Sequence, residues 1–275
     1  MNEHGPSLLS LLKHPPGTWE ARKAASWACA LGLGQSLSKE AWAQLEHASL
    51  NDQKDSRGYH AWHYWAYHGQ SLDNGERLFK NWKKLTRSMK ESSASSFLYS
   101  IDGEHPWHLL CLEGHSHMSS KALEWWGPMN EVLPSHQGLS LAHAMAWSGH
   151  AGWLDASFHE LWQNTVAPDA LGLTPLMIAV HRGGRDYIQA LLSLGLDPNE
   201  ADHHGKTALH HAALYGEPEM FNLLLDANGD PLIKDHQGLS AKHVFKMRQG
   251  HVQDKDIASL KEYWARRRLM CFRFI

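Results

Sequence analysis

Cysteine is scarce in this sequence, with three residues among 275, and they lie far apart at Cys29, Cys111 and Cys271. Because no two of them have the C-x-x-C spacing, the sequence predicts neither a disulfide framework nor a zinc ribbon, and it fits a reducing compartment. No apolar run approaches the roughly 20 residues of a membrane span, and the N-terminus lacks the basic segment of a signal peptide. We therefore expect a cytoplasmic protein without a membrane span.

Familiar catalytic motifs are missing as well. Gly32-x-Gly34 does not become G-x-G-x-x-G, because Leu37 stands at the third glycine position. His159-Glu160 is not followed by the second histidine of H-E-x-x-H, and no Ser or Cys lies in a nucleophile elbow. A formal charge of −3 does not indicate a polyanionic partner. These absences predict a non-enzymatic protein that binds neither a cofactor nor nucleic acid.

One pattern recurs at a fixed spacing of 33 residues in the C-terminal half. The segment Asp-Ala-Leu-Gly-Leu-Thr-Pro-Leu-Met-Ile-Ala from Asp169 returns from Asp202 as Asp-His-His-Gly-Lys-Thr-Ala-Leu-His-His-Ala and, more weakly, from Asp235. The second copy reads Thr-Ala-Leu-His-His-Ala from Thr207, one residue away from the T-P-L-H-x-A signature of ankyrin repeats. The chain therefore resembles an ankyrin-repeat protein.

Fainter copies of the pattern lie upstream, beginning at Lys23, His60, His105 and Ser140. The resemblance implies an all-α, helix-turn-helix repeat solenoid of about six units, with short hairpin loops and capping helices. We expect a single solenoid over residues 1–275. Its expected parts are an N-terminal cap at 1–17, divergent repeats at 18–168 with an inserted loop near 91–101, regular repeats at 169–234, and a degenerate capping repeat with a basic tail at 235–275.

The residue choices within a unit have a physical reason. Thr174 or Thr207 before a short apolar run predicts a helix N-cap, and Pro175 suits the first helical position because no donor is lost there. Gly195 and Asn228 follow the second helices, and both residue types tolerate the left-handed conformation that commonly ends a helix. Leu176, Leu209 and the alanines at 179, 212 and 213 are expected in the core.

The resemblance places partner contacts on the concave face formed by the first helices and on the hairpin tips. Positions four, seven and eight after the Thr position are expected to face outward there, and many of them are aromatic or apolar, as at binding hot spots. With the tip histidines, the predicted partner-binding residues are Trp27, Tyr64, Tyr67, His68, Leu109, Leu112, Glu113, Trp147, Ile178, His181, Arg182, His203, His204, His211, Leu214 and Tyr215. The alternative is that the divergent units are rotated and bury some of these side chains.

Tryptophan and histidine allow other interpretations. Twelve of the 13 tryptophans precede residue 165, and most, including Trp62, Trp65, Trp125 and Trp126, are expected to fill the core rather than a ligand pocket. Histidine pairs such as His203-His204 and His115-x-His117 fit zinc chemistry, yet no cysteine or carboxylate follows at matching spacing. The resemblance makes the histidine of the T-P-L-H position structural, bonded within its own unit. We expect no metal site.

The C-terminus is basic: Lys242 to Ile275 carries nine Lys or Arg against three acidic residues. The run Arg266 to Arg268 can bind nucleic acid or anionic lipid, but cations also favour a helix C-terminus, and we prefer that structural role for a terminal helix over Asp254 to Arg268.

The expected function is to bind another protein, with the chain a monomer when free. Three classes remain open: a general adaptor or scaffold; a dedicated inhibitor, immunity-type protein or secreted effector that occludes one target; and an enzyme or metal protein in the divergent N-terminal half. The sequence does not identify the partner, because the repeat signature consists of residues that build the stack.

Overall fold

Helices are the regular elements of the computed structural model, which describes residues 58–68, 72–87, 98–155, 158, 162, 167–215 and 218–249. Within these ranges no strand forms, and extended pairing is limited to the isolated bridges between Ala201 and Thr207 and between Lys234 and Ser240. The predicted all-α repeat fold is confirmed. The chain divides into two compact units, Met1–Ala170 and Leu171–Ile275, and each is described by itself.

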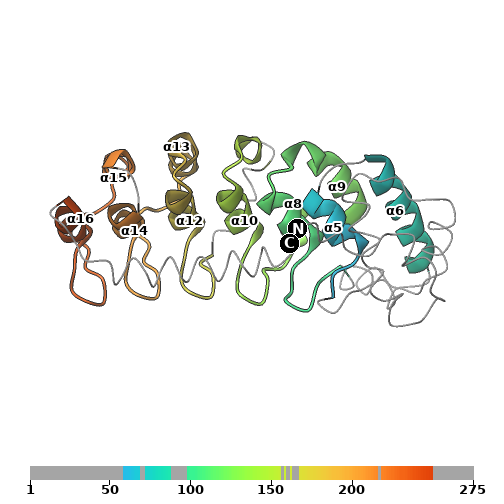
Figure 1. The fold of residues 1–275 in the computed structure, drawn as a ribbon, viewed down its shortest axis with the longest axis horizontal. Helices are drawn as coiled ribbons and strands as arrows, with labels where there is room; N and C mark the ends of the chain where they lie inside the picture. Colours follow the sequence, from blue (N-terminus) through green and yellow to red (C-terminus); the bar gives the residue numbers. More distant parts are fainter. Residues whose placement is uncertain are drawn as a thin grey trace, which may run out of the picture. The chain divides into compact units, whose positions relative to one another are not determined.

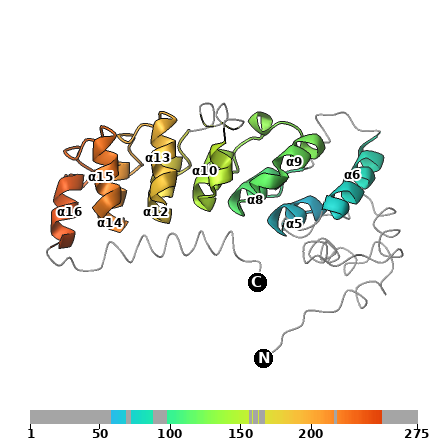
Figure 2. The same ribbon diagram turned by 90° about the horizontal axis from the view of Figure 1, so that it is seen from above.

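The first unit repeats a helix pair. Its helices are α5 (Ala61–His68), α6 (Leu72–Thr86), α8 (Pro106–Leu112), α9 (Ser119–Trp126) and α10 (Leu141–Ser148), with short 3₁₀ turns η3 (Ser116–Met118), η4 (Met129–Glu131) and η5 (Ala151–Leu154). The first helix of each pair packs on the first helix of the next, so that α8 lies between α5 and α10 (Figure 2).

The second unit has the same plan with more regular spacing. It contains α12 (Pro175–Arg182), α13 (Arg185–Ser193), α14 (Ala208–Tyr215), α15 (Pro218–Asp226) and α16 (Ala241–Gln249). Helix α14 packs between α12 and α16, and α13 lies beside α15 in a second row (Figure 1). Among the residues with a described structure, no helix has the length and apolar character needed to cross a membrane.

The starts of the first helices follow the predicted capping chemistry. The Thr174 side chain accepts a bond from the Met177 N–H (3.3 Å), and Pro175 occupies the first helical position. In the first unit His105 takes the role of the threonine, because its Nδ1 accepts a bond from the Trp107 N–H (3.2 Å). An imidazole nitrogen can therefore replace the hydroxyl as a cap, since both satisfy a free N–H of the first turn.

The ends of the second helices are as the sequence predicts. Gly195 and Asn228 have φ angles of 88° and 64°, in the left-handed region. The Asn228 N–H donates to the Leu225 carbonyl and the Gly195 N–H to the Leu192 carbonyl, each at 3.0 Å. These turns satisfy carbonyls that the helix leaves without partners.

Aromatic rings fill the core of the first unit. Trp62, Trp65, Trp125 and Trp126 are at most 8% exposed, and Trp65 packs edge-on against Trp125 with ring centroids 5.0 Å apart. A Cβ on Gly75 of α6 would lie 2.3 Å from the Trp125 ring, so this glycine makes room for the indole. The predicted core role of these tryptophans is confirmed.

Small and aliphatic residues fill the core of the second unit. Leu176 and Leu209 are fully buried, and the alanines of the first helices are nearly so: Ala179, Ala212 and Ala213 are at most 2% exposed. Alanine at these positions lets neighbouring first helices approach closely, which is the expected role.

Several predictions fall outside the described residues: the N-terminal cap, the unit from Lys23 with Trp27, most of the inserted loop and the terminal helix with its basic tail. The arrangement of the whole chain as one solenoid remains a prediction.

Candidate functional site

In the repeats that begin at His60, His105 and Thr207, the histidine three residues later bonds to the following repeat. The backbone N–H groups of His105 and Thr207 donate to Nδ1 of His108 and His210, at 3.0 and 3.1 Å. Nε2 of the same rings then lies 3.0 Å from the Leu139 carbonyl oxygen and 3.1 Å from that of Leu239. His63 makes the equivalent pair of bonds, and Nδ1 of His143 likewise accepts a bond from the Ser140 N–H. The prediction that this histidine bonds only within its own repeat is therefore incomplete, because its Nε2 bonds to the next repeat.

These bonds fix the protonation of the ring. Because Nδ1 accepts from a backbone N–H, the proton of a neutral ring must be on Nε2. The Nε2–H then donates to a backbone carbonyl of the following repeat. Burial lowers the pKa of His108 to about 4, although its backbone bonds favour the charged form. Burial, and the neighbouring His108 and His63, likewise hold the pKa of His105 well below its ordinary value. The rings are thus neutral structural links.

The hairpin tips stack on one another through backbone bonds. The His203 N–H donates to the Leu171 carbonyl (3.0 Å), and the His236 N–H to the His204 carbonyl (2.9 Å). A Cβ on Gly172 would lie 2.6 Å from the His203 backbone nitrogen, and φ there is +78°, so glycine is required for this close approach. The side chains of His203 and His204 are exposed, as predicted for partner contacts.

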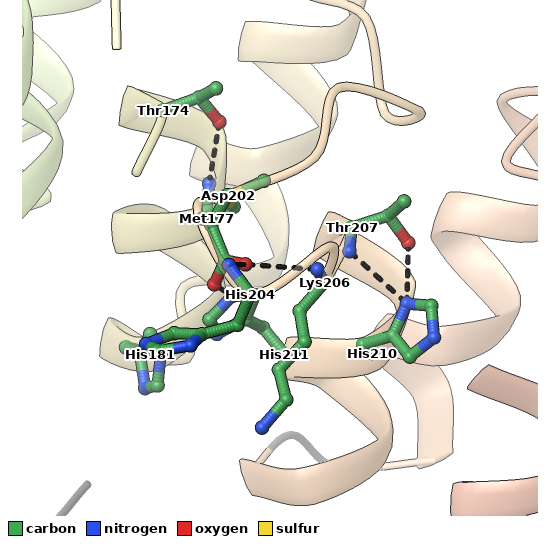
Figure 3. Close-up of polar contacts among 9 residues, drawn as sticks. All are labelled: Thr174, Met177, His181, Asp202, His204, Lys206, Thr207, His210 and His211. Atoms are coloured by element: carbon green, nitrogen blue, oxygen red, sulfur yellow. Dashed lines mark hydrogen bonds and ion pairs between the residues drawn. The ribbon is translucent and has the colours of Figure 1, made fainter. Parts of the chain in front are cut away.

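A buried chain of polar groups connects one tip to a first helix (Figure 3). Oδ1 of Asp202 accepts bonds from the His204 and Lys206 N–H groups, at 2.8 and 2.9 Å. Oδ2 lies 3.1 Å from Nε2 of His211, and Nδ1 of His211 lies 3.0 Å from Nε2 of His181. We call Asp202, His211 and His181 the relay.

The electrostatics of the relay favour an ionised carboxylate. Burial opposes ionisation of Asp202, but the bonds from His211 and from the Lys206 and His204 N–H groups outweigh it and lower the pKa of Asp202. Burial lowers the pKa of His181 to about 3, helped by repulsion from the charged form of His211. The His181 ring also lies against Tyr215, with ring centroids 4.7 Å apart.

We predicted that side chains at position four face the partner, and this prediction is wrong for three residues. Leu109 is 5% exposed, and Ile178 and His211 are 1% exposed. A first helix such as α14 has a neighbouring first helix on each side, so a position-four side chain lies between helices rather than on the concave face. These three residues are not part of an accessible surface.

Positions seven and eight reach the surface. Glu113 and Arg182 are exposed, and the others are half-buried: Tyr67, Leu112, Trp147, His181, Leu214 and Tyr215. Tyr64, at position four of α5, is also half-buried, while Trp27 and the side chain of His68 lie outside the described residues. We call the position-seven and position-eight residues of the repeats the first-helix surface. Their role in binding remains a prediction.

The histidine pairs do not assemble a metal site. Within the described part of the chain, no group of three or more His, Cys, Asp or Glu side chains is arranged to hold a metal ion. His210 and His211 point to different partners, the Leu239 carbonyl and Asp202, because adjacent residues on a helix face different directions.

Sequence reasoning missed the relay, although the sequence carried a signal for it. The tip aspartates recur as Asp202 and Asp235, and the residues nine positions later are His211 and Val244. In the Asp235 copy the carboxylate still accepts backbone bonds, from Gln237 and Leu239, without any histidine. A histidine at a position that is apolar in the neighbouring repeats therefore indicated a buried hydrogen bond to the tip aspartate rather than an exposed side chain.

Comparison with known proteins identifies the same repeats. A family model described as ankyrin repeats, in three copies, matches residues 142–235. NF-kappa-B inhibitor delta of Mus musculus is 27% identical over 155 residues, covering 54% of this chain and 47% of that protein. Inversin of Gallus gallus is 37% identical over 97 residues, covering 35% of this chain and 8% of that protein. The chain thus spans about half of the first relative and a small part of the second.

Proposed function

Because residues 142–235 of this chain are ankyrin repeats, a type of module that generally binds proteins, we propose that the chain is a non-enzymatic interaction module for a partner protein. The contacts are made by the first-helix surface and the hairpin tips. The observation that carries the proposal is a difference in burial within the first helices. The position-four side chains Leu109, Ile178 and His211 are buried between helices, whereas the side chains at positions seven and eight reach the surface.

The chemistry of the first-helix surface suits protein recognition. In the second unit it combines Arg182, Tyr215 and Leu214, and in the first unit Trp147 and Tyr67. Aromatic side chains and arginine are the types that most often dominate binding energy, because they bury large areas and still offer a polar group. Side chains that are half-buried in the free protein lose little rotamer freedom on binding.

The scaffold beneath this surface is preorganised. The His210 ring is bonded both to its own helix start and to the Leu239 carbonyl, and the His203 and His236 backbones are bonded to the preceding tips. Such links hold the relative positions of neighbouring helices and tips within the second unit. Binding of a partner to these helices and tips therefore costs little ordering entropy, which favours affinity.

The experiment that tests the proposal is affinity capture from the native source with a surface variant. Arg182→Ala, Leu214→Ala and Tyr215→Ala together truncate three of the four first-helix surface residues of the second unit, leaving His181, and α12 and α14 can still form, since alanine is a good helix former. We expect at least about a tenfold loss of the captured partner, because truncating hot-spot residues typically costs 2 kcal/mol or more.

The matched control changes exposed residues of the second helices. Arg185→Ala, Gln189→Ala and Asn222→Ala lie on α13 and α15, and all three side chains are exposed. This variant should capture the partner as well as the wild type does. Equal capture by the surface variant and the wild type, with both folded by circular dichroism, would reject the second unit's surface as the site.

A second candidate function is dedicated inhibition, in which the module occludes one target. It is favoured by the similarity to a protein named as an inhibitor of NF-kappa-B. An inhibitor should co-purify with one partner at fixed stoichiometry and reduce that partner's activity in proportion to occupancy. An adaptor should instead bring down several proteins and leave their activities unchanged.

A further inference from the structure

The hairpins of the second unit form an edge without an exposed carboxylate. They extend from the first helices on the side away from α13 and α15 (Figure 1). Asp202 and Asp235 begin the two hairpins, but each is at most 7% exposed, and Oδ1 of each accepts two backbone N–H bonds. Carboxylates held in this way are satisfied within the protein and do not face a partner. Residues 202–207 and 234–242 contain no other acid.

Lysines lie along the same edge. Lys234 and Lys242 are exposed, and Lys206 is half-buried. The His236 N–H donates to the His204 carbonyl (2.9 Å), which holds the two hairpins side by side. We call the following residues the tip edge: Lys206, Lys234 and Lys242, with the exposed histidines His203, His204 and His236. The tip edge thus places three cations on two neighbouring hairpins and the helix that follows them.

The glycines of the hairpins fix where two of the imidazole rings lie. A Cβ on Gly172 would lie 2.8 Å from Cδ2 of His203, and a Cβ on Gly205 would lie 2.8 Å from Cδ2 of His236. Each ring therefore packs against the glycine of the preceding hairpin, where the missing side chain leaves room for it. Both histidines remain exposed on their other side. The tip edge consequently has a defined shape before a partner binds.

Compensation of the helix dipoles does not account for the lysines. The start of a helix carries partial positive charge, so acids are favoured there and cations are disfavoured. The second helices follow this rule, with Asp186 and Glu219 in the first turns of α13 and α15. The first helices α12, α14 and α16 have no acid in the first turn. Instead Lys206 lies just before α14, and Lys242 is the second residue of α16. A binding role explains lysines at these places better than a structural one.

The exposed acids of the second unit, within its described residues, lie away from the tip edge. They belong to the second helices and to the loops that follow them: Asp186, Asp197, Glu200, Glu219, Asp226 and Asp230. Glu200 is the one nearest in sequence to a hairpin, and burial together with the nearby charge of Asp197 raises its pKa. The second unit therefore presents cations at its hairpins and anions around its second helices.

We propose that the tip edge binds an acidic segment of the partner protein, in which Asp or Glu side chains pair with Lys206, Lys234 and Lys242. This rests on the proposed function, because it assigns a partner chemistry to hairpin tips that belong to the proposed binding surface. The exposed imidazole rings add hydrogen-bond donors for the same carboxylates. Leu232, which is 65% exposed and lies two residues before Lys234, offers an apolar contact beside the cations.

A nucleic acid or an anionic membrane suits this edge less well than a protein segment. Such polyanions are attracted by broad fields of positive charge. The formal charge of the chain is −3, and the acids of the second helices repel a polyanion that extends around the unit. A protein segment needs only a few carboxylates at defined places, and it has apolar side chains for Leu232.

The test is a selection from a random peptide library displayed on phage, with the full, folded chain as bait. The displayed peptides have about 12 residues and reach roughly 40 Å when extended. We expect the selected peptides to contain more Asp and Glu than the starting library. Their binding should weaken as salt is raised, because exposed ion pairs are screened. Neutral or basic selected peptides, or no enrichment over beads without bait, would overturn the proposal.

The variant Lys206→Gln with Lys234→Gln connects the selected peptides to the tip edge. Glutamine keeps most of the side-chain length and removes the charge. The matched control, Gln189→Glu with Asn222→Glu, changes the net charge by the same amount at exposed positions of α13 and α15. The best peptide should bind the lysine variant about tenfold more weakly than the wild type and the control equally well. An equal loss in both variants, or no loss in the lysine variant, would contradict the proposal.

Phosphate-bearing ligands are the competing occupants of the tip edge. A single-stranded oligonucleotide and vesicles that contain phosphatidylserine are titrated with the wild type and the lysine variant. Tighter binding of either probe than of the best peptide, with the same loss in the lysine variant, would assign the edge to phosphate groups and overturn the proposal. Weaker binding of both probes would support an acidic protein segment.

Capture from the native source separates this proposal from the proposed function. A partner that is lost with Arg182→Ala, Leu214→Ala and Tyr215→Ala but kept by the lysine variant would leave the proposed function intact and refute the acidic segment. Acidic peptides that depend on the lysines, with no partner captured by the wild type, would refute the proposed function and leave the tip edge as an acidic-peptide site.

Discussion

The two units cap their first helices, and link them to the next repeat, with different residues. At α8 of the first unit, histidine serves both as the helix cap, His105, and as the link to the next repeat, His108. In the second unit Thr174 caps α12, and Met177 stands where the first unit has a linking histidine, whereas α14 keeps the link in His210. The hydrogen bond that caps the first helix is therefore made by different residues in α8 and α12, whereas the histidine link is kept at α14 and replaced by methionine at α12.

The cores differ in the same way. Indole rings fill the space between helices in the first unit, while leucine, methionine and alanine fill it in the second. Large rings tolerate irregular spacing between helices because a few of them fill a large volume, whereas alanine fits where the spacing is regular. The variants below separate these two designs.

The largest effect is expected for Trp107→Ala in the first unit. This side chain is fully buried, its Nε1–H donates to the Gly127 carbonyl (3.2 Å), and its ring packs on Trp126. Its removal should lower the free energy of unfolding by about 3–5 kcal/mol, through a large cavity. Denaturant unfolding followed by tryptophan fluorescence measures this. Half-buried Trp147, replaced by alanine, is the control and should leave the melting temperature nearly unchanged.

A smaller loss is expected for Leu209→Ala in the second unit. Leu209 is fully buried and packs beside Gly229, so its truncation should lower the unfolding free energy by about 2–5 kcal/mol. Native-state hydrogen exchange of α12, α14 and α15 amides reports this directly. Exchange rates equal to those of the wild type would show that this leucine does not contribute to the second core.

Acid should destabilise the first unit through His108. The pKa of His108 is lowered from 6.5 to about 4, so the unfolded chain binds a proton in this window that the folded chain does not. Stability contributed by neutral His108 is present above pH 6.5 and is lost as pH falls towards about 4, by up to about 3 kcal/mol.

The check is a series of unfolding curves at several pH values for the wild type and His108→Gln. The variant should be less stable at neutral pH, because it loses the His108 bonds, and it should lose less additional stability between pH 6.5 and 4. An unchanged slope would show that His108 is not the group responsible.

The smallest effect is expected for Arg185→Ala. The Arg185–Glu219 ion pair is 3.5 Å long, and its side chains are 60% and 75% exposed. Exposed pairs of this kind contribute about 0–1 kcal/mol, and thermal unfolding should shift very little. A large shift would mean that the second helices depend on surface charge rather than on Tyr187, Ile188 and Leu191 in the core.

Features with local causes could be predicted from the sequence. Thr174 with Pro175 marks a helix start, and Gly195 or Asn228 marks an end, because each residue acts on its own backbone. The burial of His211 could not be predicted in this way. Its environment is set by Asp202, nine residues earlier, and by His181 on another helix, and a polar side chain at a helix surface ordinarily indicates exposure.

The central claim is that the first-helix surface binds a partner protein. The direct measurement is photo-crosslinking in the native source, with a crosslinking amino acid placed either at half-buried Leu214 on α14 or at exposed Gln189 on α13. The account predicts one dominant cross-linked protein from position 214 and none from position 189. No cross-link at 214, or equal cross-linking from both positions, would contradict it.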